Sequence, residues 1–229
     1  MKIRVLADAA AVAVEAAECI AREGRGAVAA RGRFTFAVSG GQTPWQMLRA
    51  LVREDIPWRN VYVAQVDERV APAGDPDRNL TRLRDALLEQ VPLCPEQVLA
   101  MPVDLPDLED AVNRYAQMLQ QAAGTPPVLD LVQLGLGSDG HTASLVPGDP
   151  VLNVAKADVV VTAAYQGRRR MTLTYPMLNR ARRILWVVTG VEKAGMLLRL
   201  RDGDMTIPAA HVRRNEAMVL ADQAAAAKL

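Results

Sequence analysis

Cysteine and histidine are scarce in this sequence, with two residues of each among 229. Cys19 and Cys94 lie far apart, form no C-x-x-C pair and lack the spacing of zinc ligands. No carboxylate–histidine spacing links the two histidines, which also argues against a metal site. We therefore expect no metal and no other cofactor, and the cysteine usage favours a reduced, cytoplasmic compartment.

The sequence also lacks a charge bias and a long apolar run. The formal net charge is +1, and aromatic residues do not alternate with the arginines at 168–170, 180, 182 and 183, so nothing indicates a nucleic-acid partner. The alanine-rich segment 1–24 is interrupted by charges such as Arg4, Asp8 and Glu15. It therefore lacks both the apolar core of a signal peptide and the ~20 apolar residues of a membrane span, and we expect no membrane partner.

Half of the residues are hydrophobic and 23% are charged, which is typical of a globular chain. Apolar, β-favouring runs predict strands at 3–6, 34–38, 61–66, 98–103, 129–134, 159–163, 184–188 and 218–221. Helical spacing alternates with them at 9–30, 45–52, 79–90, 107–123, 175–181 and 189–200. This alternation predicts one doubly wound, mostly parallel α/β sheet in a single domain over 1–229.

The segment 129–150, LDLVQLGLGSDGHTASLVPGDP, joins a buried strand to a glycine-rich loop that carries Asp139 and His141. Because ligands bind at the carboxyl ends of parallel strands, this loop is a candidate site. Residues 135–140 also match G-x-G-x-x-G, but the prolines at 147 and 150 leave no room for the long helix that a dinucleotide site needs. A tight turn would explain the glycines without explaining His141.

A second glycine-rich loop, Ser39-Gly40-Gly41-Gln42-Thr43, follows the strand at 34–38 and precedes a helix for which Pro44 suits the first position. Free amides at a helix N-terminus favour a phosphate. The loop is not a Walker motif, because no lysine follows, nor a nucleophile elbow, because Ala37 stands where a glycine is needed. A capping hydroxyl at a tight turn is the alternative.

Two further polar groups are expected at the same edge of the sheet. Asp67-Glu68-Arg69 follows the strand at 61–66, and Lys193 follows the strand at 184–188. A salt-bridged loop and an exposed helix lysine are the respective alternatives. Together with Asp139 and His141, the set suits a small phosphorylated substrate and proton-transfer chemistry.

These motifs resemble the 6-phosphogluconolactonase family. The matches run from about 30 to 210 and comprise residues 39–44, 67–69, 79–80, 134–147 and 170–174, of which G-x-D-G-H-T-A-S-L-x-P is the most specific. The resemblance implies a metal-independent, cytoplasmic hydrolase that opens 6-phosphoglucono-1,5-lactone to 6-phosphogluconate in the pentose phosphate pathway. It also implies a three-layer α/β fold of the glucosamine-6-phosphate deaminase type.

The deaminases of that fold are the sharpest competitor. By the resemblance they carry Asp-Glu-Tyr where this chain has Arg69, and Gly-His-Ile-Ala-Phe-Asn-Glu-Pro where it has 140–147. The chain departs from the lactonase pattern too, with Ser138 in place of a proline and Arg78 in place of a common serine. A sugar-phosphate sensor that binds without turnover is a further alternative, and the sequence does not distinguish a monomer from a small homo-oligomer.

For lactone hydrolysis, His141 is the predicted base, because free imidazole has a pKa of ~6.5. Asp139 would orient the ring or shape the loop, and Arg69 would face the developing negative charge. Substrate contacts are predicted for Ser39, Gly40, Gly41, Gln42, Thr43, Asp67, Arg170 and Lys193.

Overall fold

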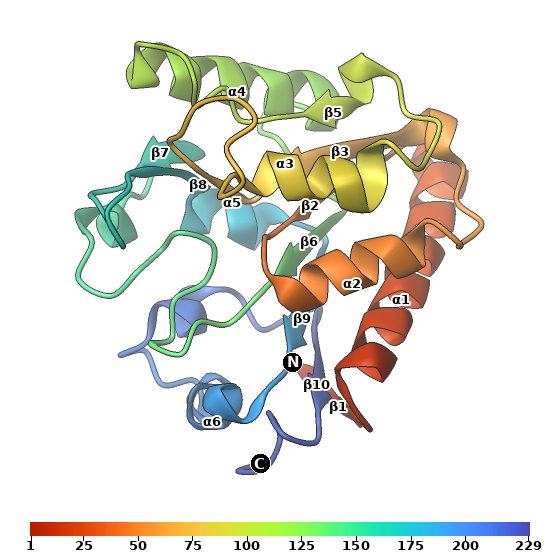
Figure 1. Cartoon of the computed structure of the whole chain (residues 1–229), viewed down its shortest axis with the longest axis vertical. Helices are drawn as coiled ribbons and strands as arrows, with labels where there is room; N and C mark the ends of the chain where they lie inside the picture. The colour runs from red at the N-terminus through yellow and green to blue at the C-terminus, as the bar shows by residue number, and fades with distance from the viewer.

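A parallel sheet of seven strands forms the centre of the computed structural model, which describes residues 1–229 (Figure 1). Its strands are β1 (Lys2–Leu6), β2 (Phe34–Val38), β3 (Val61–Gln65), β5 (Val98–Leu99), β6 (Leu131–Leu134), β9 (Arg183–Val188) and β10 (Ala217–Asp222). They lie in the order β1-β10-β9-β6-β2-β3-β5. The chain proceeds outward from β2 to β3 and β5, then returns to β6 on the other side of β2 and proceeds to β9 and β10. The order of connection therefore reverses between β2 and β6.

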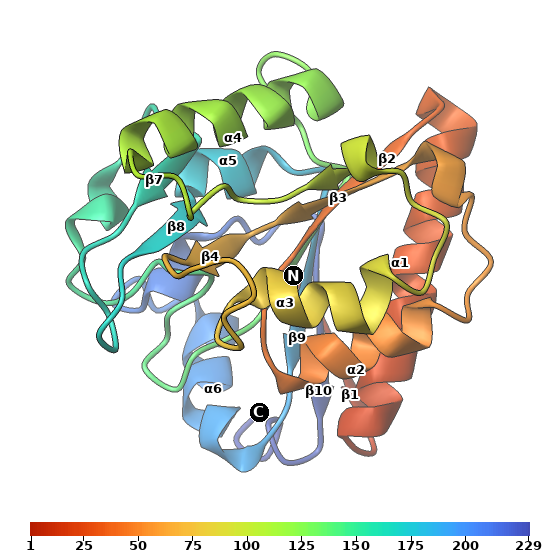
Figure 2. The same cartoon turned by 45° about the horizontal axis from the view of Figure 1, so that its top comes forward.

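Helices cover both faces of the sheet, which gives three layers (Figures 1 and 2). One face carries α1 (Ala9–Arg31), α2 (Gln42–Leu51) and α3 (Asn79–Leu83), the last continued by a π-helical segment, Arg84–Leu88. The other face carries α4 (Leu108–Ala123), α5 (Tyr175–Arg180) and α6 (Ala194–Asp202). Short 3-10 turns occupy Trp58–Asn60, Pro95–Gln97, Pro150–Asn153, Val191–Lys193 and Pro208–His211. The predicted α/β class and the alternation of strands and helices are confirmed.

A second, smaller sheet is antiparallel and has three strands. They lie in the order β4 (Asp67–Arg69), β8 (Arg170–Leu173) and β7 (Val159–Val161). The chain changes sheets at Val66, whose amide donates to the carbonyl of Val38 at 3.0 Å while its own carbonyl accepts from the amide of Leu173 at 2.9 Å. The expectation of a single sheet was therefore wrong, because Val66 exchanges a parallel neighbour for an antiparallel one. The exchange places residues 67–69 beyond the carboxyl end of β3.

Local sequence signals explain several helix boundaries. Asp8 caps α1 by accepting from the amide of Ala11 at 2.8 Å, and Asp107 caps α4 in the same way. Helix α2 begins at Gln42, so Pro44 occupies its third position rather than the predicted first. Proline is tolerated there because the first-turn N–H groups have no partner within the helix.

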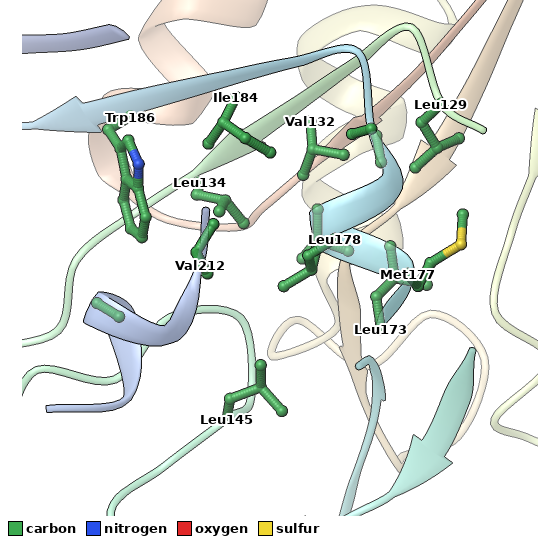
Figure 3. Close-up of a cluster of buried hydrophobic side chains, with 14 of the residues drawn as sticks. Leu129, Val132, Leu134, Leu145, Leu173, Met177, Leu178, Ile184, Trp186 and Val212 are labelled. Carbon is green, nitrogen blue, oxygen red and sulfur yellow. The ribbon is translucent and has the colours of Figure 1, made fainter. Parts of the chain in front are cut away.

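The core between the sheet and α5 also holds the glycine-rich loop in place. Figure 3 shows Leu134 of β6, Trp186 of β9 and Leu178 of α5 in one buried cluster. Leu145, four residues after His141, is fully buried in the same cluster. The loop is thus attached to the core on both sides of His141. None of the helices combines the length and the apolarity that crossing a membrane requires.

Candidate active site

A cleft of about 490 Å³ opens at the carboxyl edge of the parallel sheet. Its walls come from the loops that follow β2, β6 and β9, together with β4 and the hairpin between β7 and β8. β2 and β6 are the neighbours between which the order of connection reverses. The cleft therefore lies at the topological switch point, the usual ligand site of such sheets.

The loop after β2 presents free backbone amides to the cleft. The N–H groups of Gly40, Gly41, Gln42 and Thr43 donate to no protein acceptor, and all four residues line the cleft. Pro44, next along α2, has no N–H at all. Free amides at the positive end of a helix dipole favour an anion such as phosphate.

Hydroxyl groups on either side of these amides have different roles. The Oγ1 atoms of Thr43 and Thr189 are 2.5 Å apart, which joins the loops after β2 and β9. The buried Ser39 donates its hydroxyl to the carbonyl of Gln133 at 3.1 Å and its amide to Oε1 of the same residue at 3.0 Å. An anion in the cleft would therefore find no free donor on the Ser39 side chain.

The loop after β6 brings Asp139 and His141 into direct contact. Nδ1 of His141 lies 2.5 Å from Oδ1 of Asp139, and the His141 amide donates to the same oxygen at 3.1 Å. If Nδ1 carries the proton that Asp139 accepts, the lone pair of the ring is on Nε2. Nε2 has no protein partner, and the His141 side chain is one-quarter exposed in the cleft. The pair can therefore present a neutral base to a bound water or substrate.

These hydrogen bonds stabilise the charged form of Asp139. Burial by itself raises the pKa of a carboxyl group, but the hydrogen bonds from His141 and from the hydroxyl of Tyr165, with the charge of His141, outweigh it. The pKa of Asp139 therefore lies below its ordinary value. Asp139 is a carboxylate at neutral pH and accepts from the ring rather than donating to it.

Two glycines of the site are required by close contacts. A Cβ atom on Gly137 would lie 2.1 Å from Nδ1 of His141, and one on Gly40 would lie 2.1 Å from Oδ1 of Asn79. Both distances are far below van der Waals contact, so any side chain would displace the imidazole or the amide. Of the glycines in the G-x-G-x-x-G match, Gly137 thus makes space for His141. No helix follows Gly140 directly, which removes the dinucleotide interpretation.

Arg69 is held at the mouth of the cleft by Asn79. Nη1 of Arg69 donates to Oδ1 of Asn79 at 2.9 Å and to the carbonyl of Asp77 at 2.8 Å. The Asn79 side chain also donates to the carbonyl of Asp67 at 3.0 Å. The fully buried Glu68 accepts from the amides of Arg69, Asn79 and Leu80 at 2.7–2.8 Å. Glu68 therefore holds β4, which carries Asp67 and Arg69, to the start of α3.

Arg170 is a buried cation with unused hydrogen-bonding capacity. Arg170 is 6% exposed. Its Nε has no hydrogen-bond partner, whereas Nη2 donates to Oε1 of Gln166 at 3.2 Å. Burial lowers its pKa and the charge of Arg69 lowers it further, while Asp67 acts in the opposite direction. Arg170, Arg69 and Lys193 all line the cleft, against the carboxylates of Asp67 and Glu192. An anionic ligand would relieve the repulsion between the two guanidinium groups.

The structure brings the predicted site residues together. Every one of them lines the cleft except Asp139, which lies directly behind His141. The lining also contains polar residues that were not among the predicted site residues, including Asn79, Tyr165, Gln166, Thr189 and Glu192. For Tyr165 and Gln166 the sequence offered one signal, a glycine at 167 between the strand-like segments 159–163 and 171–174, which favours a turn there. No group of three or more His, Cys, Asp or Glu side chains is arranged to hold a metal ion.

Comparison with known proteins identifies one family and several of its members. The family model described as glucosamine-6-phosphate isomerases/6-phosphogluconolactonase matches residues 7–220. The chain belongs to this family. A 6-phosphogluconolactonase of Synechocystis sp. is 39% identical over 180 residues, which are 76% of this chain and 74% of that protein. One from Nostoc sp. is 33% identical over 235 residues, covering 99% of this chain and 98% of that protein.

Solved structures of the family share the fold. The crystal structure of a 6-phosphogluconolactonase from Thermotoga maritima has a TM-score of 0.86 at 25% identity and covers 96% of this chain and 98% of that one. A monomeric glucosamine-6-phosphate deaminase has a TM-score of 0.88 at 20% identity, with both chains covered completely. The predicted deaminase-type fold is therefore confirmed, and the second comparison shows the fold alone.

Proposed function

We propose that this protein hydrolyses 6-phosphoglucono-1,5-lactone to 6-phosphogluconate, as an enzyme of the pentose phosphate pathway. The observation that carries the proposal is the His141–Asp139 pair, whose free Nε2 faces the same cleft as four unpaired amides. The names of the Synechocystis and Nostoc relatives support the same activity. A base and an anion cradle in one cleft suit a substrate with a phosphate at one end and an ester carbonyl at the other.

Binding of the phosphate would use the loop after β2. The amides of residues 40–43 would donate to phosphate oxygens, and Lys193 with Arg170 would neutralise the charge. Asp67 would accept from sugar hydroxyls. Ser39, whose hydroxyl donates inward, would contribute its backbone position rather than its side chain.

Hydrolysis would begin when Nε2 of His141 takes a proton from water as the water oxygen attacks the lactone carbonyl carbon. Asp139 would stabilise the resulting imidazolium, and Arg69 would face the oxyanion. Collapse of the tetrahedral intermediate would break the bond between the carbonyl carbon and the ring oxygen. The imidazolium would then return its proton to the departing ring oxygen, which becomes the hydroxyl of 6-phosphogluconate.

We also propose that the chain acts as one domain, in the cytoplasm, and without a nucleic-acid partner. The two hydrophobic clusters pack on opposite faces of the same parallel sheet, which supports a single folding unit. Cys19 is buried, Cys94 is exposed and neither is in a disulfide, which is compatible with a reducing compartment. A monomer and a small homo-oligomer are both compatible with a cleft formed within one chain.

The test is lactone hydrolysis with substrate made in place. Glucose 6-phosphate and its dehydrogenase would generate the lactone, and its disappearance would be followed with and without this protein in the presence of EDTA. We expect acceleration over the spontaneous reaction, independent of the chelator. If the rate does not change, release of ammonia from glucosamine 6-phosphate would be measured next, because the deaminase shares the fold.

A further inference from the structure

Tyr165 lies at the tip of the hairpin between β7 and β8, where a tight turn fixes its position. Its amide and carbonyl both bond to the backbone of Arg168, at 2.9 and 3.3 Å. The two residues between them, Gln166 and Gly167, have φ values of 52° and 80°. Positive φ at both central residues is the geometry of a two-residue hairpin turn that matches the twist of the strands.

The Tyr165 side chain completes the hydrogen bonding of Asp139. Its hydroxyl donates to Oδ2 of Asp139 at 3.1 Å, while Oδ1 accepts from the ring and the amide of His141. Each carboxylate oxygen is therefore held from a different segment of the chain. Without the hydroxyl, only Oδ1 would be held, and a rotation of the carboxylate about its Cβ–Cγ bond would misalign the bond to Nδ1.

The phenol is suited to remain a donor. Burial raises the pKa of Tyr165, and the neighbouring charge of Asp139 raises it further. The hydroxyl therefore stays protonated over the whole range in which the enzyme would work. The Asp139 carboxylate receives a hydrogen bond from it without competing for the proton.

The ring of Tyr165 has a second contact that does not involve its hydroxyl. The guanidinium carbon of Arg170 lies 5.0 Å from the ring centroid, in the geometry of a cation–π interaction. The His141 ring meets the Tyr165 ring edge-on, with the centroids 5.7 Å apart. One side chain thus touches the imidazole, its carboxylate partner and the buried arginine of the cleft.

We propose that Tyr165 is a positioning residue with two separable effects: its hydroxyl aligns Asp139 and thereby His141, and its ring holds Arg170 toward an anionic substrate. The proposal rests on the proposed role of His141 as the base. Because the two effects use different atoms, they can be removed one at a time.

The kinetic test compares two substitutions at one position. Tyr165→Phe removes the hydroxyl and keeps the ring, so we expect kcat to fall about tenfold, as for loss of a hydrogen bond to a charged group, with KM within about twofold. Tyr165→Leu removes both, so KM should also rise, by about threefold or more, because Arg170 loses the ring face. Tyr175→Phe is the matched control, since it removes a hydroxyl that donates to the carbonyl of Pro208, outside the cleft. It should leave kcat and KM unchanged.

The NMR resonance of the His141 ring N–H tests the role of Tyr165 independently of the proposed activity. The short Nδ1–Asp139 hydrogen bond should give a downfield imidazole N–H resonance, which His211→Asn leaves in place and His141→Asn removes. We expect Tyr165→Phe to shift or broaden this resonance and Tyr175→Phe to leave it unchanged. An unaltered resonance and an unaltered kcat in Tyr165→Phe would overturn the role of the hydroxyl. A KM in Tyr165→Leu equal to that in Tyr165→Phe would overturn the role of the ring. Full activity in His141→Asn would instead refute the base assignment, while the resonance would still report on Tyr165.

Discussion

Ser144 donates its hydroxyl to Oδ2 of Asp67 at 2.6 Å, although the two residues are 77 positions apart. Both are buried, at 1% and 6% exposure. Ser144 belongs to the same loop as His141, and Asp67 belongs to β4. The bond therefore ties the loop that carries the imidazole to the strand that carries Arg69. Ser144 is the serine of the G-x-D-G-H-T-A-S-L-x-P motif. Its role in joining the loop to β4 could not be inferred from its position in the sequence.

Ser144→Ala should remove a hydrogen-bond donor from the buried carboxylate of Asp67. Loss of such a bond costs about 1–3 kcal/mol of the free energy of unfolding, measurable in urea, and kcat/KM should fall as Asp67 moves. Thr35→Val is the control, because it removes another buried hydroxyl, which donates to the carbonyl of Ala122 at 3.3 Å. It should destabilise the protein and leave kcat/KM intact. An equal loss of activity in both variants would contradict a specific role for the Ser144–Asp67 bond.

His141→Ala should lose about 10²- to 10⁴-fold in kcat, which is the usual contribution of a general base. The fold should persist, since the side chain is one-quarter exposed, and circular dichroism would check this. His211 offers the matched control, because it lies outside the cleft, is exposed and stacks on Tyr175. His211→Ala should retain kcat. Near wild-type turnover by His141→Ala would remove the imidazole from the mechanism.

Lys193→Ala should weaken binding of the phosphate more than it slows chemistry. The ammonium group of Lys193 has no ion pair within the protein, and the residue lines the cleft. A phosphate is held equally in the ground and transition states, so KM should rise about tenfold with kcat little changed. Lys156→Ala, at an exposed position outside the cleft, is the control. Hydrolysis of unphosphorylated glucono-1,5-lactone should be the same in all three proteins, and a parallel loss on that substrate would refute the assignment.

Much of the fold was predictable because its signals are local. The strand at 34–38 and the helix after Asp8 lie where apolar patterns and a capping residue placed them. The edge at which the polar loops gather followed from parallel topology. The second sheet was not predictable in the same way. Residues 67–69 pair with 170–172, and nothing local in a three-residue charged segment specifies a partner about a hundred positions away.

The site was predictable as a set of residue types, and its internal connections were not. Asp139 was expected either to orient the ring of His141 or to shape the loop, because a spacing of two residues does not distinguish the two. Only the distance of 2.5 Å from Oδ1 to Nδ1 shows the interaction. Tyr165 reaches Asp139 across 26 positions through a hairpin. Its role depends on side-chain direction, which periodicity does not encode.

The lowered pKa of Asp139 predicts how stability depends on pH. A carboxyl group whose pKa is lower in the folded state binds fewer protons there than in the unfolded chain. Its stabilising contribution is therefore complete above the ordinary value of about 3.9 and is lost as the pH falls through the lower folded value.

Asp139→Asn should accordingly be less stable than the wild type at pH 7, and the difference should persist down to about pH 4 and shrink below it. Urea unfolding of both proteins at pH 7, 5, 4 and 3 would measure the difference. A difference that already disappears between pH 7 and 5 would mean that Asp139 titrates near neutrality. It would then be a shared-proton partner of His141 rather than the permanent carboxylate that the base mechanism requires.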